Sequence, residues 1–112
     1  MPLCFDSGNP GLADFYLSYL SHIYDAAPGS LAILARSLIG HSPHVSPAPL
    51  HCCSLEAQVE GVIEVIDSVV GAFGSVAKLV LIGHSVGSWV VLQARPSAQF
   101  YHNGDNLTCP YL

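Results

Sequence analysis

Residues 79–93 have the sequence LVLIGHSVGSWVVLQ, in which an apolar, β-branched run leads into a glycine-bounded turn and then into a second apolar run. The run 79–82 is typical of a buried strand, and residues 88–93 are compatible with a helix. The turn between them, residues 83–87, has the pattern G-x-S-x-G. In this strand–turn–helix context the pattern predicts a nucleophile elbow, a sharp turn that exposes a serine hydroxyl.

The chemistry of this turn depends on Ser85 and on the amide that follows it. A serine hydroxyl is a weak nucleophile unless it is held toward a substrate carbonyl and a general base. The backbone N–H of Val86 can then face the negative charge that develops on the carbonyl oxygen. Gly83 and Gly87 carry no Cβ that would obstruct the turn. The alternative is a Gly/Ser-rich loop without chemistry, because short patterns of this kind also occur by chance.

Three short apolar runs predict buried strands. They lie at residues 3–5, 31–35 and 78–82. The second run also contains good helix formers, so a helix at 31–35 stays open as an alternative. Because segments of helical period separate these runs, the order predicts an α/β fold, with a parallel sheet of about three strands flanked by helices on both faces.

Two segments before the elbow have a helical period. Apolar residues recur at steps of three and four from Leu12 to Tyr24, which predicts a helix with one core-facing side. Ser54 is a plausible N-cap of a longer helix that ends within residues 71–75 and carries a continuous apolar stripe. The opposite side of this second helix is acidic and is expected to be a solvated surface rather than a cation site. Its acids are Glu56, Glu60, Glu64 and Asp67.

The loop after the first strand is the second candidate element of a site. Sites in parallel sheets lie beyond the carboxyl ends of the strands. Residues 7–11 and 83–87 both form sharp loops at that edge, so we expect them to meet. A backbone N–H at Asn9 could then supply a second oxyanion donor beside that of Val86. A plain tight turn is the alternative for Gly8-Asn9-Pro10-Gly11.

Composition excludes several classes of protein. The chain has 112 residues, of which 51% are hydrophobic, and a net charge of −5. These values predict at most one domain with a buried core, and so few basic residues argue against nucleic acid as a partner. No stretch approaches the roughly 18 apolar residues of a transmembrane segment, and residues 1–6 lack the features of a signal peptide. We therefore expect an intracellular protein.

The cysteines and histidines do not predict a metal site. The four cysteines, at positions 4, 52, 53 and 109, are expected to be free thiols because nothing indicates secretion. His41, His44 and His51 lie close to the Cys52-Cys53 pair, but this stretch is rich in proline and lacks paired ligand spacing. It predicts a surface loop, with a metal site as the weaker alternative.

Several of these segments together resemble the lipid droplet-associated hydrolase family of α/β-hydrolases. The resemblance covers residues 3–93. It is carried by the loop 7–11 with Phe15-Tyr16 after it, by His41, by Leu55, Gln58 and Glu60 of the long helix, and by residues 78–89. It implies a partial α/β-hydrolase fold and a serine-dependent carboxylic ester hydrolase, an esterase or lipase that acts on lipid esters at lipid droplets and needs no cofactor.

The resemblance also implies roles for individual residues. Ser85 corresponds to the nucleophile, and Asn9 and Val86 to the positions whose backbone N–H groups form the oxyanion hole. His84 is a neighbour that shapes the elbow and is not the base, because in this fold the base comes from a late loop. Lipid esters are the implied substrates, with sterol esters and acylglycerols as examples, and the droplet surface is the implied partner.

The end of the chain departs from the family's pattern. In α/β-hydrolases the triad acid and then the histidine follow the nucleophile. After Ser85 there is one histidine, His102, and one acid, Asp105, in the reverse order. We therefore expect residues 1–93 to form the N-terminal part of an α/β-hydrolase domain and residues 94–112 an irregular tail. A truncated member without a placed acid and base would be weakly active or inactive alone.

Two other functions compete with a hydrolase. One is a non-catalytic lipid-droplet or interaction protein that retains the front half of the hydrolase fold. The other is a nucleotide-binding domain, which has little support because neither G-x-G-x-x-G nor G-x-x-x-x-G-K-[ST] occurs.

Overall fold

The computed structural model describes residues 1–27, 29–42, 45–74 and 78–94. Its strands are β1 (Pro2–Asp6), β2 (Ala32–Arg36) and β3 (Val80–Gly83), and its α-helices are α1 (Leu17–Ala26), α2 (Leu55–Phe73) and α3 (Val86–Ala94). The 3₁₀ helices η1 (Ala13–Tyr16) and η2 (Leu50–Cys53) precede α1 and α2. The expected tail lies, apart from Ala94, outside the described residues, so the domain boundary after Gln93 stays a prediction.

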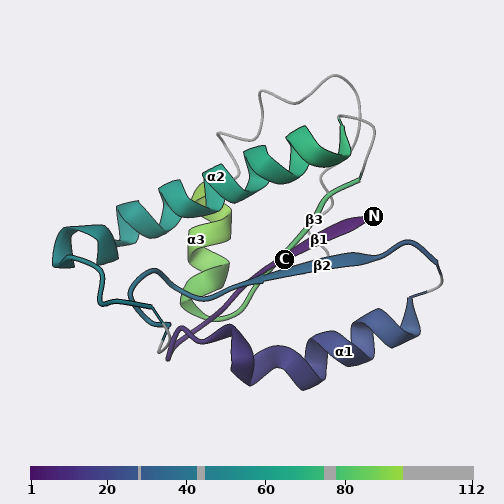
Figure 1. Cartoon of the computed structure of the whole chain (residues 1–112), viewed down its shortest axis with the longest axis horizontal. Coiled ribbons are helices and arrows are strands. Elements are labelled where there is room, and N and C mark those ends of the chain that lie inside the picture. Colours follow the sequence, from purple (N-terminus) through teal and green to yellow (C-terminus); the bar gives the residue numbers. More distant parts are fainter. Residues whose placement is uncertain (28, 43–44, 75–77, 95–112) are drawn as a thin grey trace.

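The three strands form one parallel sheet in the order β2-β1-β3. β1 pairs with β2 from Pro2 opposite Ala32, and with β3 from Leu3 opposite Val80. α1 covers one face of the sheet, whereas α2 and α3 cover the other (Figure 1). The predicted α/β class and parallel sheet are therefore confirmed. Because the strands run in one direction, the loops that follow them lie at the same edge.

The core has one part on each face of the sheet. Between the sheet and α2 with α3 lie Cys4, Val62, Ile66, Val69, Leu79, Leu81, Val90, Val91 and Ala94. Between the sheet and α1 lie Leu3, Phe5 and Leu20. Successive residues of β1 thus point to opposite faces and contribute to both parts. The face under α2 and α3 holds the larger share of buried side chains.

The strands differ in burial. Every residue of β1 is buried, whereas Ala32 and Leu34 of β2 are exposed. The second strand therefore exists where it was predicted, but the expectation that it is buried is wrong. β2 has only one neighbouring strand in the described sheet, so its outer side is left uncovered.

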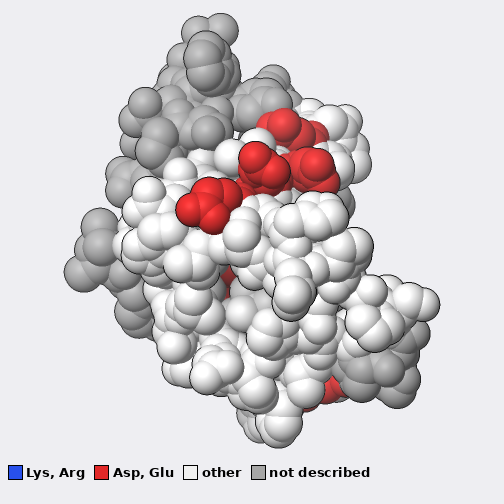
Figure 2. Space-filling model, turned by 90° about the vertical axis from the view of Figure 1, so that its left-hand side faces the viewer, with Lys and Arg blue, Asp and Glu red and all other residues white. Residues whose placement is uncertain are grey.

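α2 begins and ends as its sequence predicts. The Ser54 side chain accepts a hydrogen bond from the Ala57 amide at 3.1 Å, and Gly74 follows the last turn with a φ of 77°. The acids of α2 are exposed, and Figure 2 shows acidic side chains gathered on one face. Although α2 is the longest described helix, neither it nor another helix of the described ranges is long and apolar enough to cross a membrane.

The apolar stripe from residue 12 to residue 24 is mostly not core. Leu20 is buried, but Phe15 is 70% exposed and Tyr24 56% exposed. The segment begins with η1, whose turn of about three residues rotates Phe15 away from the stripe that α1 continues. The sheet beneath α1 has only three strands, so it covers one narrow side of the helix. The predicted core-facing side therefore exists, but it is narrower than the apolar stripe: Leu20 is buried and Tyr16 and Ile23 pack against the core, whereas Phe15, Tyr19 and Tyr24 are exposed.

Candidate active site

Ser85 lies in the turn between β3 and α3 and is exposed. Its φ is 54°, and no other non-glycine residue in the described ranges has a positive φ. A side chain in this left-handed conformation costs about 1–3 kcal/mol, so it persists only where the surrounding contacts enforce it. The turn therefore holds the Ser85 side chain outside the packed core at the carboxyl edge of the sheet.

Two glycines permit the close backbone contacts that enforce this turn. A Cβ on Gly83 would lie 2.5 Å from the carbonyl oxygen of Gly87. A Cβ on Gly87 would collide with the carbonyl oxygens of Asp6 and Ser7, at the end of β1. Such distances are far below a van der Waals contact, so only glycine fits either position without a shift of the backbone.

The loop after β1 meets the turn after β3, as the sequence predicts. The His84 amide donates a hydrogen bond to the carbonyl oxygen of Asp6 at 3.2 Å. A Cβ on Gly8 would lie 2.6 Å from Nδ1 of His84 and 2.8 Å from Cβ of Ser85. The Gly8 backbone is thus packed directly against the residue proposed as nucleophile.

The two predicted oxyanion donors flank this contact. Asn9 follows Gly8 and is exposed, and Val86 follows Ser85 as the first residue of α3. Within the described part of the chain, neither backbone N–H donates a hydrogen bond. The amides of Gly8 and Gly87 are already used, by the Tyr16 hydroxyl and the His84 carbonyl oxygen. The amides of Asn9 and Val86, which the sequence assigns to the oxyanion hole, are thus without a partner among the described residues.

Tyr16 contacts both loops, a role that sequence reasoning missed. Its hydroxyl accepts from the Gly8 amide at 3.2 Å and lies 2.9 Å from Nδ1 of His84. Its ring packs on Phe5, with a centroid distance of 4.7 Å. In the sequence Tyr16 was one member of an apolar helical stripe, and only its position shortly after the glycine loop hinted at another role.

No general base contacts Ser85 within the described residues. His84 is adjacent in sequence, but its Nδ1 is engaged with Tyr16 and its ring lies 5.6 Å from the Tyr16 ring. The Ser85 hydroxyl makes no hydrogen bond to another described residue. His102 and Asp105, the histidine and acid that follow Ser85 in the sequence, lie outside the described ranges.

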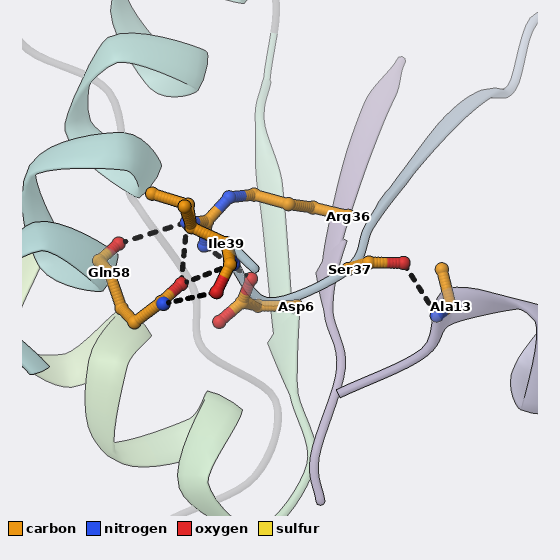
Figure 3. Close-up of polar contacts among 6 residues, drawn as sticks. All are labelled: Asp6, Ala13, Arg36, Ser37, Ile39 and Gln58. Carbon is orange, nitrogen blue, oxygen red and sulfur yellow. Dashed lines mark hydrogen bonds and ion pairs between the residues drawn. The ribbon is translucent and has the colours of Figure 1, made fainter. Parts of the chain in front are cut away.

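A buried polar network supports the end of β1 beneath this site (Figure 3). Nη1 of Arg36 donates to Oδ1 of Asp6 at 2.7 Å, and Nη2 of Arg36 donates to Oε1 of Gln58 at 3.1 Å. Gln58 in turn bonds both backbone groups of Ile39, at 2.8 and 3.1 Å. Burial raises the pKa of Asp6, and the nearby Arg36 guanidinium opposes that rise. The network ties β1, β2 and α2 together, and the sequence did not reveal it.

The loop after β2 holds the outer side of the glycine loop. His41 donates from Nδ1 to the carbonyl oxygen of Pro10 at 2.7 Å, and the Leu38 amide donates to the carbonyl oxygen of Gly11 at 2.8 Å. The Cys53 thiol of η2 contacts the carbonyl oxygen of Pro49 at 3.6 Å. In the described ranges no three histidine, cysteine or acidic side chains converge as metal ligands would. His41 is therefore a structural partner of the loop.

A family model for lipid-droplet associated hydrolases matches residues 3–102. The chain belongs to this family. The match includes both loops of the site and extends from β1 through α3. It ends inside the segment expected to be an irregular tail. Comparison with curated proteins and with solved structures gave no match. In a lipid-droplet associated hydrolase, the exposed Ser85 packed against the glycine loop is the candidate site for hydrolysis.

Proposed function

We propose that this chain is a serine-dependent hydrolase of carboxylic esters of lipids, with Ser85 as its nucleophile. The observation that carries the proposal is the strained, exposed turn at Ser85, which packs against the Gly8 backbone and is enforced by close contacts at Gly83 and Gly87. Membership in a family of lipid-droplet associated hydrolases supports lipid esters as the substrate class and a lipid droplet as the site of action.

The reaction follows from the position of the groups. The Ser85 oxygen attacks the ester carbonyl carbon and gives up its proton, and the carbonyl oxygen becomes an oxyanion that the amides of Asn9 and Val86 stabilise. Collapse of this intermediate releases the alcohol, which takes up a proton, and leaves an acyl group on Ser85. Water then hydrolyses the acyl-enzyme to the carboxylic acid. We assign no residue as the acid or the base.

Labelling with a fluorophosphonate probe tests the proposal. Such a probe forms a covalent bond with an activated serine, so we expect labelling of the full chain that Ser85→Ala abolishes. Ser68→Ala is the matched control, because Ser68 lies on the exposed side of α2 and bonds only the Glu64 carbonyl oxygen among the described residues. Labelling that persists in Ser85→Ala, or its absence from the unmodified chain, would contradict the proposal.

One observation favours a second candidate, a non-catalytic protein of the lipid-droplet surface. α1 exposes Leu17 and Tyr24 at an open depression beside β2, which is also lined by Leu20, Ser21, Asp25 and Ile33. Exposed apolar side chains of this kind suit contact with lipid. Binding of the chain to triacylglycerol droplets without any labelling of Ser85 would favour this candidate over the hydrolase.

A further inference from the structure

Tyr16 connects the two halves of the proposed site through a single oxygen. Its hydroxyl accepts from the Gly8 amide at 3.2 Å and lies 2.9 Å from Nδ1 of His84. Gly8 immediately precedes Asn9, the proposed oxyanion donor, and His84 immediately precedes Ser85. One side-chain oxygen therefore contacts the chain neighbour of both groups that the reaction requires.

The proton positions in this bridge follow from the chemistry of its groups. A backbone N–H can only donate, so the Tyr16 oxygen accepts from Gly8. The hydroxyl proton needs an acceptor, and Nδ1 of His84 is the acceptor that the described residues provide. When the Tyr16 hydroxyl donates to Nδ1, the ring proton of the neutral imidazole lies on Nε2, because the partner of one ring nitrogen sets the tautomer. A Tyr16 hydroxyl that donates in this direction selects the Nε2–H tautomer of His84 and orients its ring.

Packing fixes the position of the Tyr16 hydroxyl. The ring lies against Phe5, a β1 residue that is only 2% exposed, at 4.7 Å between centroids. The Gly8 backbone has no space to move toward the elbow, because even a Cβ there would approach His84 and Ser85 too closely. The Gly8 backbone and the elbow at His84 already touch, and the Tyr16 hydroxyl therefore restrains them from moving apart.

We propose that Tyr16 is a positioning residue of this site. Its hydroxyl holds the amide of Asn9 at a set position relative to the Ser85 oxygen and keeps His84 in the Nε2–H tautomer. The catalytic consequence rests on the proposed function, whereas the tautomer of His84 does not. Loss of the hydroxyl is expected to slow the reaction of Ser85 rather than to weaken substrate binding, since donors to an oxyanion act mainly in the transition state.

Tyr16→Phe in the full chain, with Tyr19→Phe as its control, tests this role. Both changes remove one hydroxyl and keep a ring near Phe5, but the Tyr19 hydroxyl makes no hydrogen bond to the described residues. We expect Tyr16→Phe to slow fluorophosphonate labelling of Ser85 about tenfold and to lower kcat for a short-chain nitrophenyl ester with little change in KM. We expect Tyr19→Phe to stay within about twofold of the unmodified chain.

The ¹⁵N chemical shifts of the His84 ring provide a readout that a purely structural role would not change. The unmodified chain should show an unprotonated Nδ1, and Tyr16→Phe should show a mixture of tautomers. Equal labelling rates in the two variants, or an Nδ1–H tautomer in the unmodified chain, would overturn the proposal. Absence of Ser85 labelling in the unmodified chain refutes the proposed function instead, and the ring nitrogen shifts then decide the role of Tyr16 alone. If Tyr16→Phe does not fold, the ring nitrogen shifts of His84 in the unmodified chain still test the role of Tyr16.

Discussion

The junction of β1, β3 and α3 differs from the layer formed by α1, although both are apolar in sequence. At the junction, Gly87 brings α3 against the backbone of Asp6 and Ser7, and the side chains of Asp6, Ser7 and Val90 are buried. In the other layer Leu20 is buried but Phe15 remains 70% exposed. A close contact that requires a glycine is specified by one or two residues of the sequence. The burial of a helix depends instead on how much of the sheet lies beneath the helix.

The largest expected effect is the difference in the free energy of unfolding between truncating a buried side chain and truncating an exposed side chain of the α1 layer. Leu20→Ala should lower the free energy of unfolding by about 3 kcal/mol, because it removes apolar contacts with Leu3 and Phe5 and leaves a cavity. Phe15→Ala, a larger truncation, should change it by no more than about 0.5 kcal/mol, because that side chain is mostly in solvent. Urea denaturation of both variants measures the difference. Similar losses would mean that α1 covers more of Phe15 than the structure shows.

A smaller effect is expected at the junction itself. Gly87→Ala should lower the free energy of unfolding by about 2 kcal/mol, since the new methyl group would meet two backbone carbonyl oxygens that cannot rotate away. Gly71→Ala is the control: it lies in α2 with no atom near its added Cβ, and it should raise the free energy of unfolding by about 0.5–1 kcal/mol. Thermal unfolding followed by circular dichroism compares the two, and a neutral Gly87→Ala would contradict the close contact.

The smallest expected effect is the pH dependence of the Asp6 carboxyl beneath the junction. Burial raises its pKa above the ordinary value of 3.8. Its contribution to stability is therefore fully present below that ordinary pKa and is lost as the pH rises through the raised one, where the folded chain must hold a buried charge. Asp6→Asn cannot ionise, so the stability of the unmodified chain relative to this variant should fall with rising pH. Urea denaturation from about pH 3 to about pH 7 measures this difference, and a rise would show that Arg36 outweighs burial.

Local sequence was sufficient for most of the elements. The apolar runs placed three strands, Ser54 marked the start of α2, and the pattern around Ser85 marked the turn before α3. The parallel order predicted that the two glycine loops share one edge, and the structure brings Gly8 and Ser85 into contact there. The roles of Ser85, Asn9 and Val86 in catalysis stay predictions.

Hydrogen bonds between side chains from distant segments could not be predicted from local sequence. Asp6, Arg36 and Gln58 are separated by 30 and 22 positions. Gln58 is among the residues that carry the family resemblance, but nothing in the sequence links it to Asp6 or Arg36. Tyr16 and His84 are 68 positions apart, and each alone looked like an ordinary neighbour of a loop. Such pairs form only once the strands have brought their ends together.

The order of strands and helices, the glycine loops and the exposed serine follow from the sequence, because backbone preferences and apolar periods act over a few neighbouring residues. Which apolar side chains are buried, and which polar groups meet beneath the loops, follows from the folded chain. β2 lies at an edge, α1 covers a narrow sheet, and the ends of β1 and β3 converge. Burial and long-range hydrogen bonds depend on what lies opposite a residue in space, and the chain order does not contain that information.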